Sequence, residues 1–174
     1  TVFERRVHTL CVTLGLHVPA EHISHIATTI TGVWQRHMVL DPDSRPVLQA
    51  LQQRYTLALI SNFDHPPHVY QVLAASGLVD CFQAILISGE VGVKKPAPQI
   101  FQGALERTGL QPAEVVHVGD TDDDVLGAWA AAIRPIAIRR AVHPQQALDF
   151  HVAQETSSAG SYRPCHAEVS MITR

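Results

Sequence analysis

Polar side chains with distinct chemistry follow three short apolar runs in this chain of 174 residues. The first run, residues 57–60, stops at Ser61 and Asn62, whose hydroxyl and amide groups can hold an oxyanion by hydrogen bonds. The alternative interpretation is a Ser-Asn turn that caps the following helix. This segment is therefore a candidate anion site that needs support from elsewhere in the chain.

A pair of lysines lies further along. Lys94 and Lys95 are the only two lysines in the sequence, and Pro96 follows them directly. A compact ammonium neutralises a phosphoryl group as a point charge, and a proline stiffens the loop that presents it. The alternative is a solvated basic turn. The pattern favours a phosphate-binding cation.

Four carboxylates come directly after the apolar run 115–118, at Asp120, Asp122, Asp123 and Asp124. Such closely spaced like charges repel one another, and a cluster of hard oxygen ligands suits Mg²⁺ better than a soft metal. The alternative is a helix N-terminus, where the helix dipole favours acidic residues. The cluster predicts a magnesium site at the end of a strand.

Apolar periodicity indicates which elements must position these groups. Residues 3–16 and 19–38 repeat apolar side chains at three- and four-residue steps, which predicts two helices with no strand between them. The turn formers of residues 41–46 then mark a boundary. Beyond it, predicted strands alternate with predicted helices; the strands are 55–60, 84–87, 115–118 and 135–138, and the helices are 68–76, 99–108 and 123–132.

This alternation predicts a three-layer α/β core with a parallel sheet covered by helices on both faces. In such sheets ligands collect at the carboxyl edge, where all three polar segments are expected to meet. We predict a helical unit at 1–42, an α/β core at 43–140 and a partly irregular tail at 141–174. Residues 168–172 in that tail have the composition of one further short strand.

Composition excludes several classes of function. Sixteen acidic against thirteen basic residues give a net charge of −3, too little of either sign for a nucleic-acid partner. The apolar runs fall far short of the roughly 20 residues that a membrane-spanning helix needs. Cys11, Cys81 and Cys165 form no paired motif, so we expect reduced thiols and a cytoplasmic protein.

The ordered set of motifs resembles the haloacid dehalogenase-like (HAD) hydrolases over about residues 47–140. A strand ending in Ser61-Asn62, a Lys95-Pro-x-Pro turn and a Gly-Asp120-x-x-x-Asp124 strand end carry the resemblance. It implies a Rossmann-like core with a partial helical cap at residues 1–42 that shields the site from water.

The resemblance also implies the role of each matching residue. Ser61 would bind the transferring phosphoryl group with Asn62 beside it, and Lys95 would steady the nucleophile and the phosphate charge. Asp120 would ligate Mg²⁺. Asp124 would support the ion from the same loop or through contacts with the groups that ligate it. The substrate would be a small phosphorylated metabolite.

The family's nucleophile is an aspartate in an Asp-x-Asp motif that ends the first core strand, ahead of the cap. No such motif precedes the cap here, and Asp41-Pro-Asp43 follows a helix, so we interpret it as an interhelical turn. The missing strand would leave a gap beside the strand at 55–60, with unpaired backbone groups that cost about 1 to 3 kcal/mol each. We therefore expect an incomplete piece of a longer hydrolase, or alternatively strands that close up in an inactive variant.

The resemblance predicts a magnesium-dependent phosphatase that works through an aspartyl-phosphate whose nucleophile this chain lacks. The four-carboxylate loop favours phosphate over the main alternative within the family, a 2-haloacid dehalogenase-type hydrolase. An alternative of a different class is a non-catalytic module that binds phosphate or Mg²⁺, which the missing nucleophile favours.

Overall fold

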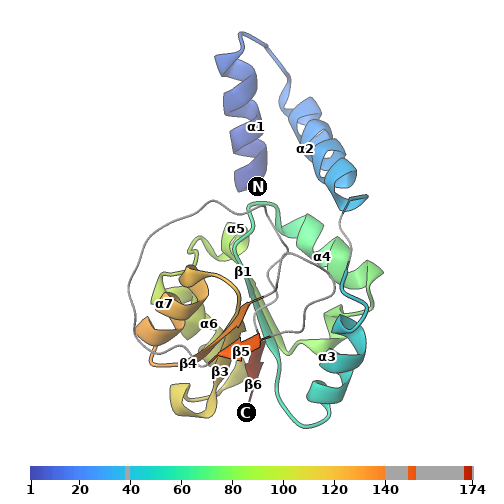
Figure 1. The fold of residues 1–174 in the computed structure, drawn as a ribbon. Coiled ribbons are helices and arrows are strands. Elements are labelled where there is room, and N and C mark those ends of the chain that lie inside the picture. Colours follow the sequence, from blue (N-terminus) through green and yellow to red (C-terminus); the bar gives the residue numbers. More distant parts are fainter. Residues whose placement is uncertain (38–39, 140–148, 152–170, 174) are drawn as a thin grey trace.

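The structure is a computed structural model that describes residues 1–37, 40–139, 149–151 and 171–173 (Figure 1). A six-stranded sheet forms the centre of the described part, and helices pack against both of its faces. The strands are β1 (Ala58–Ser61), β2 (Ala84–Ile87), β3 (Val116–Gly119), β4 (Arg134–Arg139), β5 (Asp149–His151) and β6 (Met171–Thr173). The helices are α1 (Val2–Thr13), α2 (Ala20–Gln35), α3 (Ser44–Gln52), α4 (Pro66–Ala75), α5 (Ser88–Val91), α6 (Pro98–Thr108) and α7 (Asp122–Ala130), with 3₁₀ turns at Val79–Cys81 and Pro112–Glu114.

Helices α1 and α2 form the predicted helical unit, a hairpin that stands away from one edge of the sheet (Figure 1). Their shared stripe of buried side chains is Val7, Cys11, Ile23 and Ala27. The periodicity therefore predicted both helices correctly, although Met38, the last residue of the predicted pattern, lies outside the described residues.

Alternate residues of β1 face opposite helical layers, as a strand buried on both faces requires. Ala58 and Ile60 belong to the core cluster under α6 and α7. Leu57 and Leu59 belong to the second cluster, under α3 and α4. Figure 1 shows these two pairs of helices on opposite sides of the sheet. The predicted three-layer core is thereby confirmed.

The sheet order β2-β1-β6-β3-β4-β5 corrects the expectation of an all-parallel sheet. The pairs β1–β2 and β3–β4 are parallel as predicted, whereas β6 runs antiparallel to both β1 and β3, and β5 runs antiparallel to β4. Both antiparallel strands come from the segment beyond residue 140, where the apolar pattern was too weak to predict a strand direction.

Strand β6 also fills the central gap that the missing first strand was expected to leave. Leu59 of β1 pairs with Met171, and Val116 of β3 pairs with Thr173. A strand in this position gives ladder partners to Val116, His117 and Val118 of β3 and to Leu59 of β1, which reduces the cost of unpaired buried backbone groups. The predicted strand at 168–172 is thus present in part, as Met171–Thr173, and β1 and β3 do not close up directly on each other, as the alternative interpretation had it.

No helix in the described ranges is long and apolar enough to cross a membrane.

Candidate active site at the carboxyl edge

The carboxyl ends of β1 and β3 lie at one edge of the sheet, because both strands run antiparallel to β6 between them. Ser61 is the last residue of β1 and is 7% exposed. Asp120 follows Gly119, the last residue of β3, and its side chain is exposed. The edge therefore brings together two of the three polar segments that the sequence singled out.

Lys95 connects this edge to the start of α7. Its side chain is fully buried, and its Nζ donates to Oδ1 of Asp124 over 2.7 Å and to the carbonyl oxygen of Ile60 over 3.4 Å. Lys94 is exposed, so the solvated-turn interpretation fits it and not Lys95. The ammonium of Lys95 thus bonds to the residue before Ser61 and to the carboxylate four residues after Asp120, and the predicted convergence of Ser61, Lys95 and Asp120 on one ligand stays a prediction.

The carboxylate of Asp124 is the centre of a buried hydrogen-bond network. Its Oδ1 lies 2.9 Å from Nε2 of His117, and its Oδ2 accepts hydrogen bonds from the hydroxyl of Thr121 over 2.6 Å and from the Thr121 backbone over 3.2 Å. Burial by itself raises the pKa of Asp124, but the hydrogen bond from His117 and the charge of Lys95 outweigh it, and the net effect lowers the pKa. Asp124 is therefore ionised at neutral pH, and its oxygens act only as acceptors.

Local sequence explains how Asp124 reaches this position. Thr121 is the N-cap of α7, and its side chain accepts from the backbone N–H of Asp124 in a capping box. Asp122, Asp123 and Asp124 therefore occupy the first helical turn, as the helix-terminus interpretation predicted. Gly119 leaves the necessary room, because a Cβ there would lie 2.3 Å from Cγ of Asp124.

His117 is a site residue whose contact the sequence did not predict. It was expected to be a core residue, and it is fully buried. Because Asp124 is ionised, Nε2 of His117 must be the donor in their hydrogen bond, and Nδ1 has no partner among the described residues. Burial lowers the pKa of His117 despite the adjacent carboxylate, which keeps the ring neutral. One polar residue in an apolar strand was the available signal, since it needs a buried partner.

Asn62 is bonded to the backbone of Lys95. Its Nδ2 donates to the Lys95 carbonyl over 3.0 Å, and its Oδ1 accepts from the Lys95 N–H over 2.8 Å. Asn62 directly follows Ser61, the last residue of β1. Its predicted contact with substrate stays a prediction.

The next residues of the loop contact the helical hairpin. Asp64 pairs with Arg6 of α1 at 2.5 Å, and the ring of Phe63 stacks on Trp34 of α2 at 5.3 Å between centroids. His68, on the first turn of α4, stacks on Phe63 at 5.5 Å and is 2% exposed. The loop that follows β1 thus contacts both helices of the hairpin.

The residues at the edge fit Mg²⁺ only in part. Within the described ranges, no group of three or more His, Cys, Asp or Glu side chains is close enough together to hold a metal ion. Each carboxylate oxygen of Asp124 already accepts from two donors, so Asp124 does not suit direct coordination. Asp120 does suit it, because Mg²⁺ is commonly held by one or two carboxylates together with phosphate oxygens and water.

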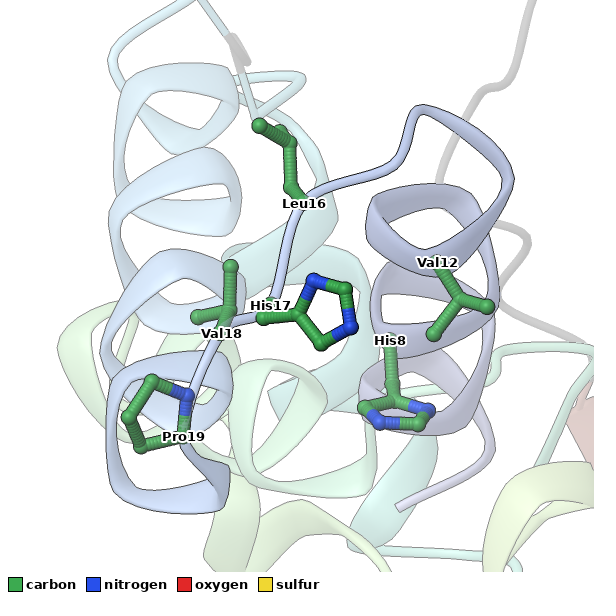
Figure 2. A pocket seen from close by; sticks show the side chains of 6 residues that line it. All are labelled: His8, Val12, Leu16, His17, Val18 and Pro19. Atoms are coloured by element: carbon green, nitrogen blue, oxygen red, sulfur yellow. The ribbon is translucent and has the colours of Figure 1, made fainter.

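A pocket of about 310 Å³ lies in the hairpin, between α1 and the connection to α2 (Figure 2). Figure 2 shows its lining side chains, which are His8, Val12, Leu16, His17, Val18 and Pro19. It carries none of the predicted site residues, and Figure 1 places this end of the hairpin away from the sheet edge. The pocket is therefore separate from the candidate active site.

A comparison with known families identifies the family of this chain. The family model for haloacid dehalogenase-like hydrolases matches residues 9–132, more than half of the chain. The chain belongs to this family. The matched residues include the Lys95 turn and the Asp124 strand end. They begin within α1, so the helical hairpin is part of the region that resembles the family.

Individual relatives include both phosphatases and a dehalogenase. The chain is 36% identical over 113 residues to phosphoserine phosphatase from Thermus thermophilus, covering 64% of this chain and 45% of that protein. A HAD phosphatase structure from Thermococcus onnurineus has 26% identity and a TM-score of 0.60, covering 78% of this chain and 60% of the other. A 2-haloacid dehalogenase structure from Pseudomonas syringae pv. Tomato has 25% identity and a TM-score of 0.61, with coverages of 83% and 63%. The chain thus spans less than half the length of the curated relative.

Proposed function

We propose that this chain carries the phosphate-binding site of a magnesium-dependent HAD phosphatase acting on a small phosphorylated metabolite. The observation that supports the proposal is the buried Lys95 ammonium, which bonds to the Ile60 carbonyl next to Ser61 and to Asp124 in the helix that starts just after Asp120. The similarity to phosphoserine phosphatase and to a HAD phosphatase structure supports phosphate as the ligand class.

The side chains divide the work between hydrogen bonding and charge. The hydroxyl of Ser61 donates to a phosphoryl oxygen, and the ammonium of Lys95 neutralises the phosphoryl charge. Asp124 and the Ile60 carbonyl keep that ammonium aimed at the edge. Because Lys95 is fully buried in the structure, a bound phosphoryl group requires a local opening that uncovers Nζ.

Magnesium would be held by Asp120. Asp124 would support the site without ligating the ion directly, because its carboxylate is bonded to Thr121 and Lys95. When bound, the ion supplies positive charge that stabilises the transferring group. In the family reaction, an aspartyl-phosphate would form on the nucleophile aspartate of the Asp-x-Asp motif. These 174 residues hold no such motif ahead of the cap.

A second candidate is a non-catalytic module that uses the same site only to bind phosphate. The observation that favours it is β6, which lies between β1 and β3 where the nucleophile strand of the resembling fold was expected. Both candidates require anion binding at Lys95, and they differ only in turnover. For either one we propose a cytoplasmic location, which suits the free thiols of Cys11 and Cys81.

Calorimetric titration with inorganic phosphate, with and without Mg²⁺, tests the proposal. We expect the wild-type chain to bind phosphate more tightly when Mg²⁺ is present. The Lys95→Met variant should lose most of this binding, because it removes the cation. Lys94→Met is the matched control, since it removes the neighbouring exposed lysine, and it should bind like wild type.

Magnesium is tested in the same way with Asp120→Ala and with Asp123→Ala, an exposed acidic neighbour, as the control. Only Asp120→Ala should weaken the dependence of phosphate binding on Mg²⁺. Identical phosphate titrations for wild type and folded Lys95→Met would overturn the proposed function, and identical Mg²⁺ titrations for wild type and Asp120→Ala would remove the ion from it.

A further inference from the structure

One side chain satisfies both backbone polar groups of Lys95. Asn62 donates to the Lys95 carbonyl and accepts from the Lys95 N–H, although the two residues lie 33 positions apart in the sequence. A pair of hydrogen bonds to one residue fixes that residue in the way that a neighbouring strand would. The loop that carries Lys95 is thereby held against the end of β1.

Lys95 is consequently fixed at both of its ends. Asn62 holds its backbone, while the Ile60 carbonyl and Asp124 hold its ammonium. Ile60 and Asn62 flank Ser61 in the sequence. The two hydrogen bonds from Asn62 form a backbone clamp on Lys95. This clamp sets the position of the Lys95 loop relative to the Ser61 hydroxyl, which is proposed to bind the same phosphoryl group as Lys95.

The loop that carries Asn62 is itself anchored on the other side. The Phe63 carbonyl accepts from the Gly89 N–H over 3.0 Å and from the Ser88 hydroxyl over 3.4 Å. A Cβ at Gly89 would lie 2.7 Å from that carbonyl oxygen, so the close approach of the two segments requires glycine. The backbone next to Asn62 is therefore held in place, and the side-chain amide of Asn62 has little freedom to turn towards another partner.

We propose that Asn62 is a positioning residue that affects phosphate binding through Lys95 and does not contact the phosphoryl group itself. This inference rests on the proposed function of Lys95 and replaces the direct substrate contact predicted for Asn62. Its amide oxygen and one of its N–H groups are already used by the Lys95 backbone, and these bonds account for its position at the site.

The composition of the chain allows a direct test by NMR spectroscopy. Asn62 is the only asparagine, and Lys95 is the only buried lysine of two, so ¹⁵N-labelled lysine and asparagine each report on one residue of interest. Burial slows exchange of the Lys95 ammonium protons with water, whereas those of exposed Lys94 exchange rapidly. The Lys95→Met variant assigns the Nζ signal.

We expect Asn62→Ala to shift or broaden the Lys95 Nζ signal before any phosphate is added, because the loop loses its clamp. It should also weaken phosphate binding about tenfold, as expected for misplacing a charged hydrogen-bond donor. When phosphate is added to wild type, the Lys95 Nζ signal should move, while both Nδ2 protons of Asn62 should stay in place.

Leu48→Ala controls for a general loss of stability. Leu48 is buried in the core cluster on the opposite side of β1, so its truncation lowers stability without touching the Lys95 loop. It should leave the Lys95 signal and the phosphate affinity unchanged. If Leu48→Ala matches Asn62→Ala in both readouts, the effect of Asn62 is merely structural and the inference is wrong.

The remaining outcomes separate this inference from the proposed function. An unchanged Lys95 signal in Asn62→Ala overturns the positioning role whether or not phosphate binds. A large phosphate-induced shift of the second Asn62 Nδ2 proton also overturns it, in favour of direct contact. Absence of phosphate binding by wild type, with a Lys95 signal that still depends on Asn62, rejects the proposed function and leaves Asn62 as a clamp for a lysine with another role.

Discussion

The ammonium of Lys95 lies 2.7 Å from the carboxylate of Asp124, and neither side chain is more than 1% exposed. The pair joins the loop after α5 to the first turn of α7 beside the end of β1. Buried ion pairs lose hydration on folding, so their net contribution to stability is small, but removing one partner leaves an uncompensated charge. The pair is therefore both part of the site and a point of vulnerability in the fold.

Replacing Asp124 by alanine should strongly destabilise the protein. The variant leaves the Lys95 ammonium buried without its carboxylate, and it also removes the acceptor of His117. We expect a loss of about 3 to 5 kcal/mol in the free energy of unfolding, measured by urea denaturation. Asp123→Ala, which removes the exposed carboxylate one residue earlier, should cost less than about 1 kcal/mol. Similar losses for the two variants would contradict the central role of the buried pair.

Stability should fall as the solution is acidified below neutral pH. Burial lowers the pKa of His68 below the ordinary value of 6.5, and neighbouring His65 lowers it further. The unfolded chain then binds more protons than the folded one below about pH 6.5, so the free energy of unfolding is largest above that pH and decreases as pH falls through it. The pKa values of His65 and His117 are lowered as well, so both act in the same direction.

The His68→Phe variant isolates one part of this pH dependence. It keeps an aromatic ring against Trp34 and Phe63 but removes a buried group that has no hydrogen-bond partner among the described residues. Urea denaturation at about pH 7.5 and about pH 5.5 should show a smaller difference for this variant than for wild type. His22→Phe, at an exposed position of α2, should retain the wild-type difference. The assignment fails if both variants behave alike.

Replacing Gly127 and Gly32, two glycines within helices, by alanine should change the stability of the protein in opposite directions. At Gly127 a Cβ would lie 2.4 Å from the ring of Phe101 and 2.9 Å from the carbonyl oxygen of Pro96, so Gly127→Ala should cost about 1 to 3 kcal/mol through overpacking. At Gly32 in α2 a Cβ meets nothing within 4 Å, and Gly32→Ala should stabilise by about 0.5 to 1 kcal/mol. Thermal unfolding of both variants checks the signs, and a stabilising Gly127→Ala would refute the close packing of α7 on the Pro96 loop.

The 174-residue polypeptide should not hydrolyse p-nitrophenyl phosphate, even with Mg²⁺. The reaction of the family needs an aspartate nucleophile at the end of a central strand, and β6 lies at the position expected for that strand. The measurement is the release of p-nitrophenolate. Turnover that is lost in Lys95→Met and kept in Lys94→Met would show that another group serves as the nucleophile.

Residue spacing predicted most of the elements around the site. The predicted strand at 84–87 matches β2, and the helix predicted at 99–108 differs from α6 by one residue at its start. Such elements are set by local patterns, which are apolar runs for strands and three- and four-residue repeats for helices. The strand at 55–60 begins later, at Ala58, because Tyr55 and Thr56 are only half-buried and precede the ladder with β2. The four-residue helix α5 carries too short a pattern to be predicted.

The sequence by itself therefore determined the layers of the core and the polar residues at its carboxyl edge, since the ends of the parallel strands β1 and β3 are marked by Ser61 and Asp120. Only the tertiary structure decided what each group contacts. It paired Lys95 with Asp124, attached Asn62 to the Lys95 backbone and placed β6 between β1 and β3. These contacts join residues from 29 to over 100 positions apart, and their partners are chosen by burial and hydrogen-bond satisfaction in the folded protein, which no local pattern records.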